Sequence, residues 1–215
     1  MSDESSRRPL KVRGAAWSKN IASYLSKKDI TPNQISVMSI VFSAISALFI
    51  VMIPSSTGIS TWLYSILAAL FIQMRLLCNL FDGMVALEGG KSTKSGELYN
   101  DIPDRVSDSI LFIAVGYSIS VVSWGAELGY FAALAAMMTA YVRVLGASMN
   151  AGSCFKGPMA KQHRMALLTV TLLLTPIFNN GEGMLLFIAL SLIALGSLVT
   201  VMNRTYTIYK TLEEK

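Results

Sequence analysis

The stretch QISVMSIVFSAISALFIVMI, residues 34–53, contains no charged side chain. A helix needs about 20 apolar residues to cross the hydrocarbon core of a bilayer, so this stretch predicts a transmembrane helix. Further apolar stretches follow at 61–81, 104–124, 126–147, 164–179 and 184–203. We therefore predict an all-α integral membrane protein with six transmembrane helices.

The composition of the whole chain agrees with this prediction. Of its 215 residues, 53% are hydrophobic and 14% are charged, whereas soluble domains carry about 25% charged residues. Such a chain cannot cover a water-soluble surface, which excludes a soluble enzyme and a disordered segment. The two cysteines, Cys78 and Cys154, indicate no disulfide framework.

The lysines and arginines lie on alternate sides of the predicted spans. Seven of the 18 precede the first span, and the loops near 54–60, 123–127 and 179–183 contain none. Positive residues accumulate on the cytoplasmic side, so both termini are expected in the cytoplasm. The net charge of +5 then reflects topology, and we expect no nucleic-acid partner. The expected location is a bacterial inner membrane.

Three regions follow from this layout: a cytoplasmic segment (1–33), a six-helix transmembrane domain (34–203) and a cytoplasmic tail (204–215). Within the first region, AAWSKNIASYLSKK (15–28) predicts an amphipathic helix at the cytoplasmic interface. Its lysines lie opposite an apolar face that contains Trp17, Ile21, Tyr24 and Leu25. A soluble helix packed on the cytoplasmic loops remains the alternative.

Polar residues cluster where spans two and three approach the cytoplasm. Asn79 and Asp82 share one helix face, and the following helix carries a polar stripe at steps of three and four residues. The stripe consists of Glu97, Asn100, Asp104 and Asp108. Ionisable groups at membrane depth are costly and point to function. Antiparallel helices would bring the two faces together at the cytoplasmic edge.

Two interpretations of this cluster are open. Carboxylate and amide oxygens suit a hard cation such as Mg²⁺. Alternatively, Arg75, Arg105 and Arg143 neutralise the carboxylates in a structural ion-pair network. Glycines favour the first interpretation because they allow close approach of the backbone to phosphate groups. These glycines are Gly83, Gly89, Gly90 and Gly96.

At these residues the sequence resembles the CDP-alcohol phosphotransferase (phosphatidyltransferase) family. The family signature is D-x2-D-G-x2-A-R-x8-G-x3-D-x3-D. The chain keeps its spacing over residues 79–104, and ITPNQIS (30–36) is similar to the family's lead-in to its first span. The matching positions are Asp82, Gly83, Ala86, Gly96 and Asp104. The departures are Asn79 and Asn100 at aspartate positions and Leu87 at the arginine position.

The resemblance implies that an alcohol hydroxyl attacks the β-phosphate of a CDP-activated lipid such as CDP-diacylglycerol, with release of CMP. Two divalent cations, Mg²⁺ or Mn²⁺, are implied near the aspartates, with Asp104 as the general base and a homodimer as the assembly. The donor would lie against Gly83, Ala86 and Gly96. By this transfer Asn79, Asp82, Asn100 and Asp104 are the expected metal ligands, and Asp108 is added because it lies on the same helix face one turn deeper.

The two asparagines remove two negative charges from this centre. We therefore hypothesise a metal site re-centred on Asp82, Asp104 and either Asp108 or Glu97, holding one ion instead of two. Amide oxygens can still bind Mg²⁺.

The loop at 148–166 and the end of the fourth span supply cations for an alcohol or phosphorylated alcohol acceptor. The candidates are Arg143, Lys156, Lys161 and Arg164. Positive-inside bias is an alternative reason for the two lysines.

Three functions are compatible with these features. The first is a metal-dependent phospholipid-biosynthesis enzyme of the CDP-alcohol type. The second is a catalytically impaired relative that binds lipid or acts as a scaffold, because three motif positions have changed. The third is a transporter, which fits least because the charges cluster at one edge and no pair of broken helices reaches the midplane.

Overall fold

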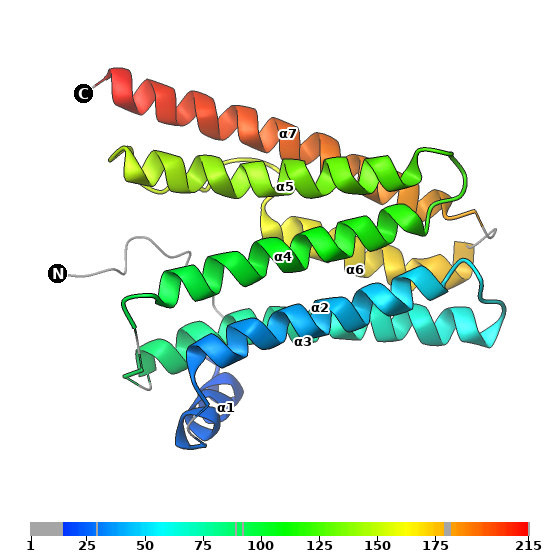
Figure 1. Cartoon of the computed structure of the whole chain (residues 1–215), viewed down its shortest axis with the longest axis horizontal. Coiled ribbons are helices and arrows are strands. Elements are labelled where there is room, and N and C mark those ends of the chain that lie inside the picture. Colours follow the sequence, from blue (N-terminus) through cyan, green and yellow to red (C-terminus); the bar gives the residue numbers. More distant parts are fainter. Residues whose placement is uncertain (1–14, 29, 89, 92, 179–181, 215) are drawn as a thin grey trace.

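The computed structural model describes residues 15–28, 30–88, 90–91, 93–178 and 182–214. Within these residues the chain is all-helical and contains no β-strand (Figure 1), as predicted. The basic residues before position 15 lie outside the described residues. The helices are α1 (Ala16–Lys27), α2 (Pro32–Met52), α3 (Ile59–Glu88), α4 (Gly96–Tyr117), α5 (Gly125–Ser148), α6 (Lys161–Phe178) and α7 (Met184–Glu213).

Four of these helices are long and apolar enough to cross a membrane: α2, α3, α5 and α7. The other two predicted spans are helices as well, α4 and α6. The first half of α4 carries several charged residues, and α6 has 18 residues and includes Lys161 and Arg164. That α4 and α6 also cross the bilayer stays a prediction.

Helices α2 to α7 form a closed ring in which sequence neighbours are not always spatial neighbours. Starting from α3, the order around the ring is α3, α2, α4, α5, α7 and α6, and α6 returns to α3. Fully buried apolar side chains such as Ile72, Phe112 and Leu190 fill the core. Outward-facing Leu48 and Leu195 are each 60% exposed, as expected for a surface in contact with lipid.

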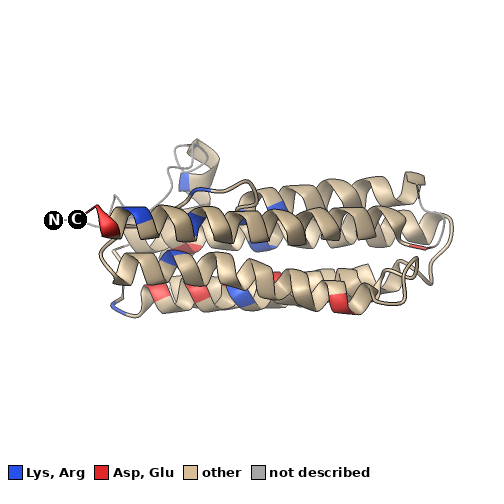
Figure 2. Ribbon diagram, turned by 90° about the horizontal axis from the view of Figure 1, so that it is seen from above, with Lys and Arg blue, Asp and Glu red and all other residues tan. Residues whose placement is uncertain are grey.

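The two ends of the bundle differ in charge. Figure 2 shows that the described lysines and arginines lie in the half of the bundle that contains the C-terminus. Helix α1 lies at this end and packs on α3, where Trp17 meets Phe81 edge to face at 6.2 Å. Trp17 and Tyr24 remain 46% and 60% exposed, so α1 has an apolar face free for a lipid interface. That position in the bilayer stays a prediction.

Several helix boundaries differ from the predicted spans. Helix α4 ends at Tyr117, so the prediction of a span up to residue 124 was too long. The chain turns there because the Ser118 hydroxyl bonds the Ile50 carbonyl and the Ser120 and Val121 amides bond the Glu182 carbonyl. Helix α7 continues to Glu213, through the residues predicted as a tail.

Helix α2 begins at Pro32, as the residues before it dictate. Thr31 accepts a hydrogen bond from the Gln34 amide, and the Gln34 side chain accepts one from the Thr31 amide. This capping box satisfies two otherwise unpaired donors at the start of the helix. It fixes the turn of α2 that places Ser36 against α3.

Candidate active site

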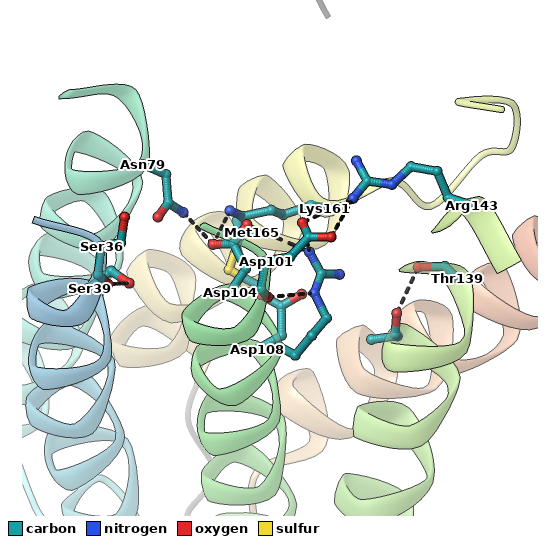
Figure 3. Close-up of polar contacts among 12 residues, drawn as sticks. Ser36, Ser39, Asn79, Asp101, Asp104, Asp108, Thr139, Arg143, Lys161 and Met165 are labelled. Atoms are coloured by element: carbon teal, nitrogen blue, oxygen red, sulfur yellow. Dashed lines mark hydrogen bonds and ion pairs between the residues drawn. The ribbon is translucent and has the colours of Figure 1, made fainter. Parts of the chain in front are cut away.

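The polar residues of α3 and α4 meet across a gap. Helix α2 packs against both α3 and α4 in the ring. The polar side chains of α3 therefore reach those of α4 past the side of α2. The Asn79 amide nitrogen donates to Asp104 Oδ1 at 2.8 Å. Figure 3 shows this nitrogen turned toward Asp104 and the amide oxygen turned away from it. The predicted convergence of the two polar faces is therefore present in the structure.

Asp104 lies among cations from three helices. Lys161 Nζ lies 2.5 Å from Asp104 Oδ1, and Arg75 Nη2 lies 3.7 Å from the same oxygen. Arg105 Nη2 lies 3.6 Å from Asp104 Oδ2. The residue is 6% exposed, so these ion pairs are only weakly screened by water. The charge of Asp104 is thus compensated by the protein itself.

Asp82 has a different environment. It is 4% exposed, and its carboxylate accepts hydrogen bonds from the Ser36 hydroxyl at 2.6 Å and from the Gly83 amide at 2.5 Å. Within the described part of the chain, no lysine or arginine forms an ion pair with it. A buried carboxylate without a direct ion-pair partner is costly, which makes Asp82 a candidate ligand for a cation from solution.

Asp108 lies one turn deeper on α4 and is held by two arginines. Arg75 Nη2 donates to Asp108 Oδ1 at 2.6 Å, and Arg164 Nη2 donates to Asp108 Oδ2 at 3.0 Å. Both guanidinium groups are almost fully buried. A metal ion would have to displace an arginine to reach Asp108, so this geometry fits a clamp between α3, α4 and α6 better than the expected metal ligand.

A polar pocket of about 200 Å³ opens beside Asp104. Among the residues that line it are the predicted Asn100, Arg143, Lys161 and Arg164. Of the predicted acceptor residues, Lys156 is exposed and its backbone oxygen accepts from Arg204 Nε at 3.0 Å. Other lining residues were not predicted for the acceptor: Asp101, Arg105, Thr139, Phe155 and Arg204.

Arg204 was missed because its charge, just after the last apolar stretch, has the same topological explanation as any cytoplasmic arginine. In the structure its Nη1 bonds the Thr139 carbonyl of α5 at 2.5 Å. A signal for it exists only in three dimensions, since Thr139 is 65 residues away. Arg143 reaches Asp101 at 3.0 Å (Figure 3), and its guanidinium lies over the Phe155 ring.

The residues predicted to contact the donor lie on the motif helices outside this pocket. Gly83 and Ala86 are in the last two turns of α3, and Gly96 is the first residue of α4. Glu97 follows Gly96 and is exposed. The donor candidates therefore lie near the end of α3 that follows Asp82 and at the start of α4. Most of the acceptor candidates line the pocket beside Asp104.

The segment before α6 is held against α7, and this places Lys161. The Met159 amide donates to the Thr200 hydroxyl at 3.0 Å. Gly157 has φ +124°, and a Cβ there would lie 2.5 Å from Thr200 Cγ2. Only glycine combines this backbone conformation with so close an approach. Burial lowers the pKa of the Lys161 ammonium below its ordinary value, although the neighbouring Asp104 carboxylate opposes this shift.

Two oxygen donors of α3, Asp82 and Asn79, fit a hard cation. Among the described residues, no three His, Cys, Asp or Glu side chains are grouped to hold a metal ion. Asp82 offers a carboxylate without a direct ion-pair partner, and Asn79 on the same helix face offers an amide oxygen. Oxygen donors of these two kinds suit Mg²⁺ or Mn²⁺.

A bundle of apolar helices with carboxylates, amides and cations gathered at one end defines a membrane protein with a polar site at that end. Its sequence matches the CDP-alcohol phosphatidyltransferase family over residues 29–205, and the chain belongs to this family.

Individual relatives agree. The phosphatidylinositol phosphate synthase of Corynebacterium glutamicum is 28% identical, covering 86% of this chain and 80% of its own length. Two crystal structures of the phosphatidylinositol phosphate synthase of Mycobacterium tuberculosis share the fold at 17% identity. The one with CDP-DAG bound has a TM-score of 0.70 and covers 91% of this chain and 94% of its own. The one in complex with manganese and citrate has a TM-score of 0.71 and covers 89% and 88%.

Proposed function

We propose that this chain transfers a phosphatidyl group from a CDP-activated lipid, of the CDP-diacylglycerol type, to an alcohol acceptor. The observation that carries the proposal is Asp104, which lies between the motif residues of α3 and the basic pocket. A base at this junction can serve a donor on one side and an acceptor on the other. The synthase relatives and the structure with CDP-DAG bound support the class of donor.

In this reaction the acceptor hydroxyl attacks the phosphorus that carries the diacylglycerol. The bond between this phosphorus and the oxygen bridging to the cytidine phosphate breaks, and CMP leaves. Asp104 takes the hydroxyl proton as general base, which typically contributes about 10²–10⁴-fold to a rate. Gly83, Ala86 and Gly96 border the donor, and the negative charge of the phosphates is met by nearby cations of the chain.

A divalent cation, Mg²⁺ or Mn²⁺, fits Asp82 with the side-chain oxygen of Asn79. When bound there, it would neutralise charge on the diphosphate and polarise it for attack. The manganese in the structure of the mycobacterial synthase supports this cofactor class. Asn100 lines the pocket, where its amide can orient the acceptor, and Asp108 positions Arg75 and Arg164.

The acceptor side favours an alcohol that carries a phosphate. The pocket is lined by Arg105, Arg143, Lys161, Arg164 and Arg204. Several of these cations are paired with only two carboxylates of the pocket, Asp101 and Asp104. Guanidinium groups bind phosphate oxygens in pairs of hydrogen bonds. Arg164 is paired with Asp108, so the five cations of the pocket outnumber the three carboxylates paired with them, and a phosphate on the acceptor would compensate the excess positive charge.

The test is CMP release by the purified chain in lipid nanodiscs with labelled CDP-diacylglycerol, Mg²⁺ and a panel of acceptors. The panel pairs free and phosphorylated forms, such as inositol with inositol phosphate and glycerol with glycerol phosphate. We expect CMP release with a phosphorylated member. Asp104→Asn and Asp82→Asn should abolish it, while Glu127→Gln, the same chemical change on an exposed residue at the far end of α5, should not.

A second candidate is a lipid-binding protein without catalysis, favoured by Asn79, Asn100 and Leu87 at positions where the family motif has charges. Binding of the labelled CDP-lipid without CMP release under any acceptor would establish it and exclude the transferase. Equal CMP release from the wild type and Asp104→Asn would also exclude the proposed mechanism.

A further inference from the structure

The two carboxylates that the motif retains have opposite surroundings. Asp104 is paired with Lys161 and lies within 4 Å of Arg75 and Arg105. Among the described residues, Asp82, equally buried, is hydrogen-bonded to neutral donors, and Lys161 acts on it without forming an ion pair. If two divalent cations bound at this pair, the one at Asp104 would meet a carboxylate whose charge is already compensated by Lys161, Arg75 and Arg105. The asymmetry indicates that an external cation is needed on the Asp82 side alone.

Lys161 is the cation best placed to account for this asymmetry. It is the first residue of α6, and the segment before it is anchored to α7 through Thr200. Its ammonium makes the shortest contact of any cation with Asp104, at 2.5 Å. Arg75, by contrast, is primarily committed to Asp108 and donates to it at 2.6 Å. Lys161 thus supplies a fixed positive charge directly at the retained carboxylate.

The two asparagines of the motif also reduce the need for a second divalent cation. Asparagine in place of aspartate at positions 79 and 100 removes two negative charges, which equals the charge of one divalent cation. A site with these two amides attracts the second dication less strongly. Lys161 provides a single positive charge that needs no recruitment from solution, and an ammonium binds carboxylate and phosphate oxygens as a point charge.

We propose that Lys161 replaces one of the two divalent cations that the family resemblance implies. The site then holds one divalent ion on the Asp82 side and a built-in ammonium on the Asp104 side. This inference rests on the proposed function, because it assigns the metal stoichiometry of the same site. It gives Lys161 a role toward the reacting phosphates that differs from holding the acceptor.

The experiment counts Mn²⁺ bound by the full chain in nanodiscs, by the EPR signal of free Mn²⁺ and by calorimetry. We expect one ion per wild-type chain, and loss of at least tenfold in affinity in Asp82→Asn. Asn100→Asp restores a motif carboxylate while Lys161 is present, so one ion is still expected. The double variant Asn100→Asp/Lys161→Met should bind two ions.

Matched controls isolate the charge of Lys161. Asn100→Asp/Lys161→Arg keeps the positive charge and should bind one ion. Asn100→Asp/Lys210→Met makes the same replacement at an exposed lysine in the last turn of α7 and should also bind one. The single variant Lys161→Met should bind its one ion at least tenfold more tightly, because a repelling charge beside it is gone.

The inference is overturned if the wild type binds two ions or none, or if Asn100→Asp binds two with Lys161 in place. It is equally overturned if Lys161→Met changes neither affinity nor stoichiometry while the KM for the acceptor rises, since Lys161 would then serve the acceptor alone. Failure of the proposed function looks different: the Mn²⁺ counts follow the expectation, but no CMP is released.

Discussion

The two halves of the helical ring contribute differently to the site, although α3 and α4 also supply Arg75 and Arg105. Helices α3 and α4 supply the carboxylates and amides of the motif, within residues 79–108. Helices α5, α6 and α7 supply Arg143, Lys161, Arg164 and Arg204, which are spread over more than 60 residues. The acidic half is compact in sequence, whereas the basic half is assembled only by the fold. The site depends on the contacts that join the two halves.

The largest expected effect comes from breaking the Asp108 clamp. Asp108→Ala leaves the guanidinium groups of Arg75 and Arg164 buried without their carboxylate, which typically costs about 3–5 kcal/mol. The measurement is the free energy of unfolding in detergent by chemical denaturation. Asp101→Ala is the control, because its pair with Arg143 is partly exposed and such pairs contribute about 0–1 kcal/mol. Equal losses in both variants would contradict the clamp.

The second effect concerns how the basic half is placed. In Gly157→Ala the new Cβ would lie 2.5 Å from Thr200 Cγ2, and the alanine backbone would have to adopt φ +124°. Gly152→Ala is the matched control, since Gly152 has φ +80° but open space around it. We expect Gly157→Ala to cost about 1–3 kcal/mol more than the control, as overpacked sites do. The same unfolding measurement applies, and a difference near zero would show that the segment moves without cost.

These contacts also show how far the sequence alone reaches. Apolar length predicts that each stretch is a helix, and the motif predicts that Asn79 and Asp104 converge, because both depend on local patterns. Helical spacing predicts the face on which Asp108 lies, but not that arginines from α3 and α6 occupy both its oxygens. The roles of Arg204 and Gly157 depend on α7 packing against residues more than 40 positions away.

The third effect tests the basic half as the acceptor site. Arg143 is partly exposed, and within the described part of the chain it contacts Asp101 and the Phe155 ring. Asp101 is also paired with Arg105, so Arg143→Gln leaves no buried charge unpaired. We expect the KM for a phosphorylated acceptor to rise about tenfold, since hydrogen bonds to charged groups contribute about 1.5–3 kcal/mol and water recovers part of this. The KM for the CDP-lipid should stay unchanged. A change in the KM for the lipid alone would place the donor, and not the acceptor, beside Arg143.

The smallest effect comes from adding a cation to the acidic half. Leu87 is 59% exposed at the end of α3, so Leu87→Arg, which restores the family's arginine, should leave the unfolding free energy within about 0.5 kcal/mol of the wild type. An exposed charge near a phosphate contributes about 0.2–1 kcal/mol, so we expect the KM for the CDP-lipid to fall by a factor of about two to five. Leu98→Arg makes the same change at 58% exposure in the first turn of α4. If it lowers the KM equally, the gain is general attraction of an anionic lipid, whereas a gain confined to position 87 places the donor on the acidic half.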